Sequence, residues 1–440
     1  IRDGHVTGVQ TCALPISLFW MWAVAFLGAS TSFVECTLGQ IYKTKDQLTG
    51  EYRGGPAYYF RRALAHTRAA GFFKVYGLLF AAVTVLACGI LMPGIQANSM
   101  AESMHNAWPS IDKWVIGSAT MLVLGFVVIG GVKRIANFAA VVVPFMAILY
   151  IGLALVVVAI NIDQVPETLR LIFASAFGLD AGFGAILGSA IMWGVRRGIY
   201  SNEAGQGTGP HAAAAAEVSH PAKQGLVQAF PVYIDTLFVC SATGFLILST
   251  GAYRVYDGDA ISASVPVLRD TDLLETGADP NSYVSTGFDT MWSGAGSSFV
   301  AISLAFFCFT TIIAYYYMAE TNLRFLLGKH AKTYIRPLRS TLGGDLTLVL
   351  QATILIAVVY GAVSTPDAAW ALGDIGVGAM AWLNIVGILI LQQPAFKALR
   401  DYESQKKMGK DPIFDPQKLG IVGAKFWENY SPRSTETEVV

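Results

Sequence analysis

The 440-residue sequence is 54% hydrophobic and 14% charged, and its acidic and basic residues balance to a formal net charge of zero. Soluble domains carry about 25% charged residues, so the composition excludes an ordinary soluble fold. The neutral balance gives no basis for a nucleic-acid partner. Four cysteines lie inside apolar stretches without a CxxC spacing, which excludes a disulfide framework and a cysteine metal site: Cys36, Cys88, Cys240 and Cys308.

The chain divides into three predicted parts. Residues 1–16, IRDGHVTGVQTCALPI, have neither a starting Met nor an apolar run and resemble translated sequencing-adapter read-through, so we predict a non-native segment there. Residues 17–396 form a predicted transmembrane domain, and residues 397–440 form a polar cytoplasmic tail.

A spanning helix needs about 20 predominantly apolar residues. The sequence predicts nine such spans, at about 17–41, 72–103, 112–131, 137–161, 182–212, 224–251, 297–326, 343–363 and 367–394. The fold class is therefore an all-α polytopic membrane protein, with the lipid bilayer as its surroundings.

Lysine and arginine set the predicted orientation, because cytoplasmic loops carry an excess of both. With the loop at 42–71 in the cytoplasm, the basic residues fall mainly on that side, among them Lys43, Arg61, Arg62, Lys133, Arg134, Lys329, Lys332, Arg336 and Arg339. Few fall outside: Lys113, Arg170, Arg254 and Arg269. We expect a multi-pass protein of the cell membrane with the tail also cytoplasmic.

The span at 182–212 differs from the others because its second half, GVRRGIYSNEAGQGTGP, is rich in glycine and charge. Irregular backbone at membrane depth is tolerated only where it is buried in protein or lines a cavity. We therefore predict that Gly194 and Gly198 bracket an unwound stretch between two half-helices, whose ends suit a carboxylate and a cation. The alternative is a span that ends near Val195, with Arg196 and Arg197 in a loop.

Several motifs resemble the alanine or glycine:cation symporter family. They are FWMWAVAFLG (19–28), EYRGGPAYYF (51–60), GIQANSMAES (94–103), GGVKRIA (130–136), RGIYSNEAG within 194–210, YIDTLFVC (233–240) and FTTIIAYYYMAE (309–320). The likeness runs in order from Ser17 to about Tyr402. Two departures are Ala314-Tyr315, where the family has Gly-Trp, and Met318-Ala319-Glu320, where it has YGE.

The resemblance implies a LeuT-like inverted-repeat transporter. Four predicted spans precede the broken span, and five run from the broken span to the end. An inverted repeat needs two equal halves, so the first half is one span short. We expect an N-terminally truncated chain without its first broken helix. The implied function is symport of sodium, or of protons, with a small neutral amino acid such as alanine or glycine, by alternating access. The alternatives are a transport-inactive truncated fragment and an ion channel.

Other classes of function find no support in the residues. No HExxH, GxSxG or comparable catalytic pairing is visible, so no enzyme activity and no cofactor are expected, and sodium is the only metal implied.

Candidate substrate-binding residues lie in three spans. Gln96 is placed in the second span as a hydrogen-bonding partner of the amino acid, while Asn98 is expected to join helices. At the broken span the candidates are Gly194, Gly198, Ser201 and Asn202. For Ser201 the favoured role is to cap the second half-helix. Tyr315 is the candidate where the sequence departs from the family.

Candidate ion-binding residues form two groups. Thr310 and Thr311, with a nearby carbonyl assigned to Phe307, suit a dehydrated sodium ion, and the resemblance places a sodium site on that helix. Their alternative is a back-bonded helix surface. Asp235 and Thr236 lie near mid-depth, where a carboxylate is an ion site, a proton carrier or a partner of Arg196 or Arg197.

Overall fold

The computed structural model describes residues 15–46, 50–129, 132–177, 187–253, 255–256, 267–269, 272–273, 282–327 and 346–428. Within these residues the regular secondary structure is helical apart from two short antiparallel strand pairs. One pairs β1 (Thr44–Lys45) with β2 (Tyr52–Arg53), and the other pairs β3 (Val255–Tyr256) with β4 (Val267–Arg269).

Six helices in the described residues are long and apolar enough to cross a membrane, or seven if a bent pair is counted as one span. The six are α2 (Pro15–Ile41), α4–η1–α5 (Ala70–Leu86, Ala87–Leu91, Met92–Ala107), α11–η4–α12 (Pro221–Tyr233, Ile234–Cys240, Ser241–Thr250), α14 (Gly296–Leu327), α16 (Leu346–Val363) and α17 (Pro366–Leu391). The bent pair joins α7 (Val132–Ile160), through the 3-10 turn η2 (Ile162–Gln164), to α8 (Val165–Ala176) at an angle of 81°.

The remaining helices are shorter. They are α3 (Pro56–Ala63), α6 (Lys113–Ile129), α9 (Leu187–Asn202), α10 (Gly209–Ala215), α13 (Tyr283–Asp289), α18 (Gln393–Lys407) and α19 (Lys425–Glu428). The prediction of an all-α polytopic protein is confirmed, but the nine predicted spans correspond to six or seven by length and apolarity. The difference arises because α6 is short and because the span predicted at 182–212 is two short helices, α9 and α10.

Proline and glycine set many of the helix ends. Pro56, Pro210, Pro221 and Pro366 each stand in the first turn of a helix, where the missing N–H removes no hydrogen bond. Gly251 ends α12 in the left-handed conformation at φ 70°.

Two of the long spans contain a π-helical segment. Pro93 is the second residue after η1, and Pro231 precedes η4 by three residues. A proline removes one helical hydrogen bond, and the π turn absorbs the mismatch. Asp235 lies in η4, so the π-helical distortion coincides with the carboxyl side chain of this span.

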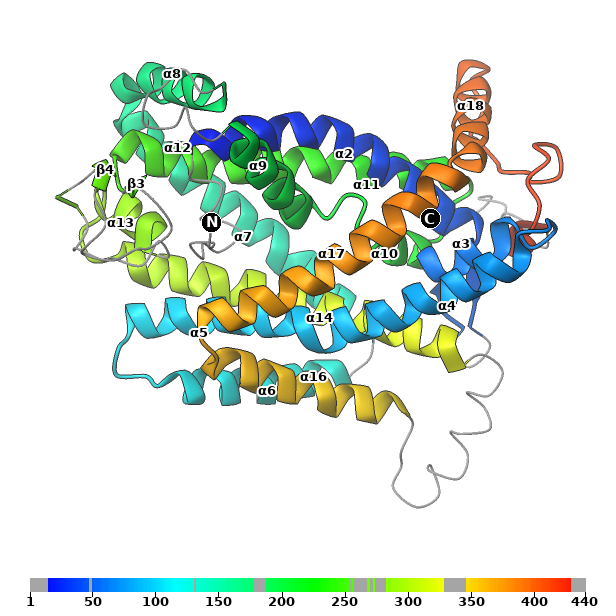
Figure 1. Cartoon of the computed structure of the whole chain (residues 1–440), viewed down its shortest axis with the longest axis horizontal. Helices are drawn as coiled ribbons and strands as arrows, with labels where there is room; N and C mark the ends of the chain where they lie inside the picture. The colour runs from blue at the N-terminus through cyan, green and yellow to red at the C-terminus, as the bar shows by residue number, and fades with distance from the viewer. Residues whose placement is uncertain are drawn as a thin grey trace, which may run out of the picture.

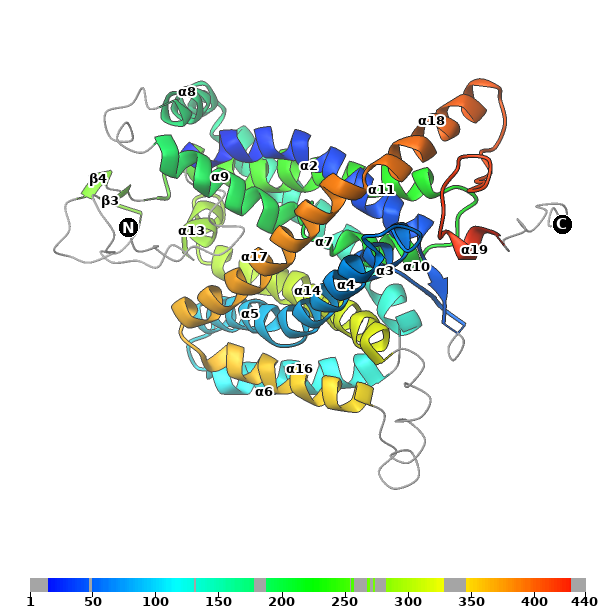
Figure 2. The same ribbon diagram turned by 45° about the vertical axis from the view of Figure 1, so that its right-hand side comes forward.

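The long helices run side by side, with α2 beside α11 and α5 between α14 and α16 (Figure 1). One core cluster joins α2, α3, α4, α5, α6, α14, α16, α17 and the C-terminal segment. A smaller one joins the start of α2 with α7, α8, α12, α13 and the first half of α14. At one end of the molecule α18 and α19 lie near α3, while α8, α13 and the β3–β4 hairpin lie at the other end (Figure 2).

The C-terminal segment after α18 folds back onto the helices. Phe414 N donates to Ser219 O at 3.1 Å, and Trp427 Nε1 donates to Gln40 O at 2.9 Å. Lys223 and Asp411 form an ion pair at 2.7 Å. The tail predicted at 397–440 is therefore packed against the ends of α2 and α11 as far as Glu428.

Some predictions fall outside the described residues. These are most of the segment at 1–16, the loop residues Arg254, Lys329, Lys332, Arg336 and Arg339, and the end of the tail at 429–440.

Candidate functional site

The break in this segment begins at Glu203, five residues beyond Gly198 and so outside its predicted position. Helix α9 is continuous through Gly194 and Gly198 and ends at Asn202. The chain then leaves helical geometry at Glu203, whose φ is 56°, and α10 begins at Gly209. The prediction of an unwound stretch is thus right in kind, but its placement between Gly194 and Gly198 is wrong.

The two glycines do not mark an unwound stretch because their role is close packing between helices. A Cβ added at Gly194 would lie 2.3 Å from the Cβ of Trp20, and one at Gly198 would lie 3.2 Å from Cγ1 of Val24. Both glycines therefore let α9 approach α2, and neither needs an irregular backbone.

The break opens onto a polar cavity of about 250 Å³. Its walls come from α2, the end of α9, the start of α10 and the α11–η4 span. Three carboxylates line it, those of Glu35, Glu203 and Asp235, and the lining in the described part of the chain contains no basic side chain. Such a site favours a bound cation or an ammonium group.

Asp235 stands at the centre of a hydrogen-bond cluster that joins η4 to α9. Ser201 Oγ donates to Asp235 Oδ2 at 2.6 Å, and Thr236 Oγ1 donates to the same oxygen at 3.4 Å. Asn202 Nδ2 donates to Thr236 Oγ1 at 3.1 Å. The structure thus brings together four residues that the sequence singled out separately. Ser201 lies in the last turn of α9 and does not cap a following half-helix, so the capping role predicted for it is wrong.

Arg196 pairs with an acidic residue other than Asp235, the partner considered from the sequence. It forms an ion pair with Asp374 on α17, so Asp235 is not its counter-ion. The Arg197 guanidinium lies over the rings of Trp193 and Trp370, at 5.0 and 4.9 Å from their centroids. Both arginines therefore tie α9 to its surroundings on the side away from the break.

Tyr315 reaches the same region from α14. Its hydroxyl donates to Glu203 Oε1 at 3.4 Å, and its side chain is buried. Glu203 itself is the one described non-glycine residue with positive φ. Such a conformation costs about 1–3 kcal/mol and is typically held in place by the surrounding structure.

Other predicted residues lie elsewhere. Gln96 is half-buried on α5, and Asn98 beside it donates to Gly361 O and Ser364 O on α16 and the turn after it, at 3.1 and 2.8 Å. This is the helix-joining role expected for Asn98.

The hydroxyls of Thr310 and Thr311 both donate to Phe307 O, at 2.9 Å each. They adopt the back-bonded arrangement that was their alternative, and the hydroxyl oxygens keep acceptor capacity. The described lining of the acidic cavity does not include Phe307, Thr310, Thr311 or Gln96.

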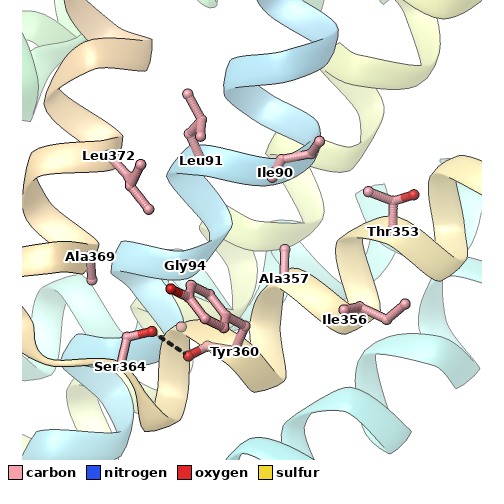
Figure 3. Close-up of a pocket in the computed structure, with 11 residues that line it drawn as sticks. Ile90, Leu91, Gly94, Thr353, Ile356, Ala357, Tyr360, Ser364, Ala369 and Leu372 are labelled. Atoms are coloured by element: carbon pink, nitrogen blue, oxygen red, sulfur yellow. Dashed lines mark hydrogen bonds between the residues drawn. The ribbon is translucent and has the colours of Figure 1, made fainter.

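A second cavity of similar volume lies between α5, α16 and α17 (Figure 3). Its described lining is mainly apolar and carries no charged side chain, and the hydroxyl of Ser364 is turned to Tyr360 O at 2.6 Å. Ile356 and Tyr360 are mostly exposed on its outer side. A zwitterion would lose its hydration there without compensation, so the acidic cavity is the candidate site.

Sequence reasoning missed three contributors to the acidic cavity and its walls. Glu35 was not among the predicted site residues, and its side chain is 1% exposed. Thr208 and Gln228 line the cavity and were not singled out. The sequence does carry a signal for the break itself, the segment GQGTG at 205–209, because closely spaced glycines indicate left-handed backbone.

The carboxylates are spread around the cavity. In the described residues no three His, Cys, Asp or Glu side chains gather closely enough to hold a metal ion by themselves. A bound cation would therefore be shared between a carboxylate and neighbouring hydroxyl or carbonyl oxygens, as at Asp235, Ser201 and Thr236.

A polytopic helical protein whose broken helix opens onto an acidic cavity belongs to the class of membrane transporters. The sequence model of the sodium:alanine symporter family matches residues 4–416, and the chain belongs to that family. It is 51% identical to the putative sodium/proton-dependent alanine carrier protein YrbD of Bacillus subtilis (strain 168), over 99% of this chain and 85% of that protein.

Two further relatives extend the comparison. The sodium/proton-dependent alanine carrier protein of Bacillus sp. (strain PS3) is 48% identical over 98% of this chain and 91% of its own length. The probable sodium/glutamine symporter GlnT of Bacillus subtilis (strain 168) is 40% identical over 94% of this chain and 78% of its own length. The family predicted from the motifs is confirmed. The predicted N-terminal truncation is not supported, because the first two relatives align over 99% and 98% of this chain.

Proposed function

We propose that this protein is a secondary active symporter that couples the influx of sodium, or of protons, to the uptake of a small neutral amino acid. The observation that carries the proposal is the acidic cavity at the break between α9 and α10. Alanine is the first candidate substrate because two relatives at 51% and 48% identity are named as sodium/proton-dependent alanine carriers. Glycine is the second, since it is smaller.

Asp235 is the proposed cation ligand, together with Thr236. Carboxylate and hydroxyl oxygens suit sodium, and the carboxylate alone suits a proton. Thr310, Thr311 and the carbonyl of Phe307 form the proposed second ion site on α14. Sodium at either place would offset the negative charge of the cavity as the substrate enters.

Ser201 and Asn202 are the proposed substrate contacts at the break, with Tyr315 as the aromatic wall. Gly194 and Gly198 would contribute through the close approach of α9 to α2. Gln96 is the proposed contact from α5. The amino group of the substrate would face the acidic lining, and its carboxylate would face sodium or the backbone N–H groups of the break.

A LeuT-like inverted repeat is the proposed architecture, with α9 and α10 as one of the broken helices typical of that fold. Irregular backbone beside a polar cavity, between two half-helices, is the feature that supports it. Alternating access would then expose the cavity to each side in turn. The loop at 42–71 and the C-terminal tail are proposed to face the cytoplasm, because basic residues gather there.

Uptake into proteoliposomes tests the proposal. The protein is reconstituted, and radiolabelled alanine is supplied with an inward sodium gradient, an inward proton gradient or neither. We expect gradient-dependent uptake that unlabelled glycine competes against, and a loss of at least tenfold in Asp235→Asn.

The matched control is Glu102→Gln, which removes a buried carboxylate paired with Lys113 outside the cavity. Absence of gradient-dependent uptake of alanine, glycine and glutamine by the wild-type chain would overturn the proposal.

A further inference from the structure

The break between α9 and α10 has an unusual backbone for the buried interior of a helical protein. Three of its residues have left-handed φ angles: Glu203 at 56°, Gly205 at 86° and Gly207 at 84°. A stretch of this kind cannot use the regular helical hydrogen bonds, so its N–H and C=O groups need other partners in the low-dielectric interior.

Glu35 on α2 supplies those partners. Gly205 N donates to its Oε1 at 3.1 Å, and Gly207 N donates to its Oε2 at 3.1 Å. One carboxylate therefore holds two left-handed residues of the break, one on each oxygen. Hydrogen bonds from N–H groups to a carboxylate are about twice as strong as neutral ones.

Asn384 on α17 completes the arrangement from the opposite side. Its Nδ2 donates to Glu35 Oε2 at 2.5 Å and to Gly205 O at 2.9 Å. Its Oδ1 accepts from the hydroxyl of Tyr59 on α3. Since Glu35 is 1% exposed and Asn384 0%, water cannot replace these bonds.

We propose that Glu35 is the positioning residue of the broken helix: its carboxylate clamps Gly205 and Gly207 and so fixes the shape of the cavity that receives substrate and cation. The inference rests on the function proposed above and deepens it. Glu35 also lines that cavity, so the group that holds the break and the wall of the site are the same side chain.

The geometry requires a carboxylate at this position. A glutamine has the same shape but only one acceptor oxygen, and its NH2 group would face the N–H of Gly205 or Gly207. Two N–H donors would then face each other, and the backbone N–H of one glycine would lose its hydrogen-bond acceptor. An aspartate keeps both acceptor oxygens on a side chain shorter by one methylene group, so it restores the clamp in part.

Cys36 offers a reporter that does not depend on transport. The thiol is fully buried beside Glu35, and a Cβ added at Gly209 would lie 3.1 Å from its Sγ. The start of α10 therefore covers Cys36, and release of the break would uncover it. Cys88 is equally buried, lies against Met380 and serves as the internal control.

The experiment measures modification of Cys36 and Cys88 by N-ethylmaleimide in purified protein, read by mass spectrometry of the two peptides. The proteins are wild type, Glu35→Gln, Glu35→Asp and the control Glu102→Gln. We expect Cys36 to react at least tenfold faster in Glu35→Gln, and by an intermediate factor in Glu35→Asp. Cys88 should react at the wild-type rate in all four proteins.

Two labelling results would overturn the inference. If Cys36 reacts at the wild-type rate in Glu35→Gln, the clamp does not hold the break. If Cys36 and Cys88 both react faster, Glu35 supports the whole fold and not the break in particular.

Alanine uptake by the same proteins adds the link to the site. We expect Glu35→Gln to raise the KM for alanine at least tenfold, with a smaller loss in the maximal rate, and Glu35→Asp to recover part of the KM. An unchanged KM with only a lower maximal rate would contradict a role in shaping the site. If no protein takes up alanine, the proposed function fails, while the labelling result still decides the role of Glu35.

Discussion

Gly207 occupies a position in the break that requires glycine, and Gly207→Ala should therefore damage the protein. Its φ of 84° lies in the left-handed region that L side chains rarely adopt. An added Cβ would also lie 2.7 Å from Pro56 Cγ and 2.8 Å from Phe80 Cζ. Both neighbours are parts of packed helices, so neither can move away freely.

The magnitude follows from two contributions. The left-handed backbone costs about 1–2 kcal/mol for a residue with a Cβ. Overpacking of a filled interior costs about 1–3 kcal/mol. Together they predict a loss of about 2–5 kcal/mol in the free energy of unfolding, which is a large part of the stability of a typical domain.

The assay is thermal unfolding in detergent, followed by size-exclusion fluorescence, together with alanine uptake. Gly378→Ala is the matched control, because Gly378 lies in α17 and an added Cβ there meets no atom within 4 Å. We expect Gly207→Ala to unfold at a clearly lower temperature and to lose uptake, while Gly378→Ala matches the wild type or exceeds it. Equal unfolding temperatures for the two variants would refute the reasoning about the break.

Three further predictions concern other parts of the molecule. Burial lowers the pKa of Lys43 to about 7, against partial compensation by the charge of Glu217. Because the unfolded lysine keeps its proton to about pH 10.4, wild-type stability should rise relative to Lys43→Met as pH increases above 7, in thermal melts from pH 6 to 9. The partly exposed pair of Arg196 and Asp374 should show a coupling of about 0.2–1 kcal/mol in a double-mutant cycle of thermal stability. Asn98→Ala should cost about 1 kcal/mol of stability and leave the KM for alanine unchanged, as uptake assays can check.

The membrane spans could be predicted from the sequence because they depend on local composition. Runs of apolar residues located α2, α4–α5, α14, α16 and α17 closely. The contacts among Ser201, Asn202, Asp235 and Thr236 could be predicted in part, since polar side chains at membrane depth require hydrogen-bonding partners.

The position of the break could not be read with the same certainty. A glycine in a membrane helix serves close packing or irregular backbone, and the sequence alone does not distinguish the two. Gly194 and Gly198 serve packing against α2, whereas Gly205 and Gly207 have left-handed backbone. The distinction depends on what lies opposite each glycine, which only the assembled helices decide.

Glu35 and its partners were missed for a related reason. Asn384 lies 349 residues further along the chain, and no local pattern links the two. A single acidic residue near the end of an apolar run is typical of a membrane surface. Its true surroundings, two backbone N–H groups and a buried amide, arise from tertiary contacts alone.

The packed C-terminal segment has a consequence for synthesis. Trp427 donates its indole N–H to Gln40 O across 387 residues, so the end of α2 receives one of its neighbours only after nearly the whole chain has been made. At about 5–20 residues per second, that interval is roughly 20–80 s. Until then the end of α2 lacks this hydrogen bond, although the helix itself is complete. A chain that ends before Phe414 should therefore be less stable at this end of the molecule, even though every long apolar span is present.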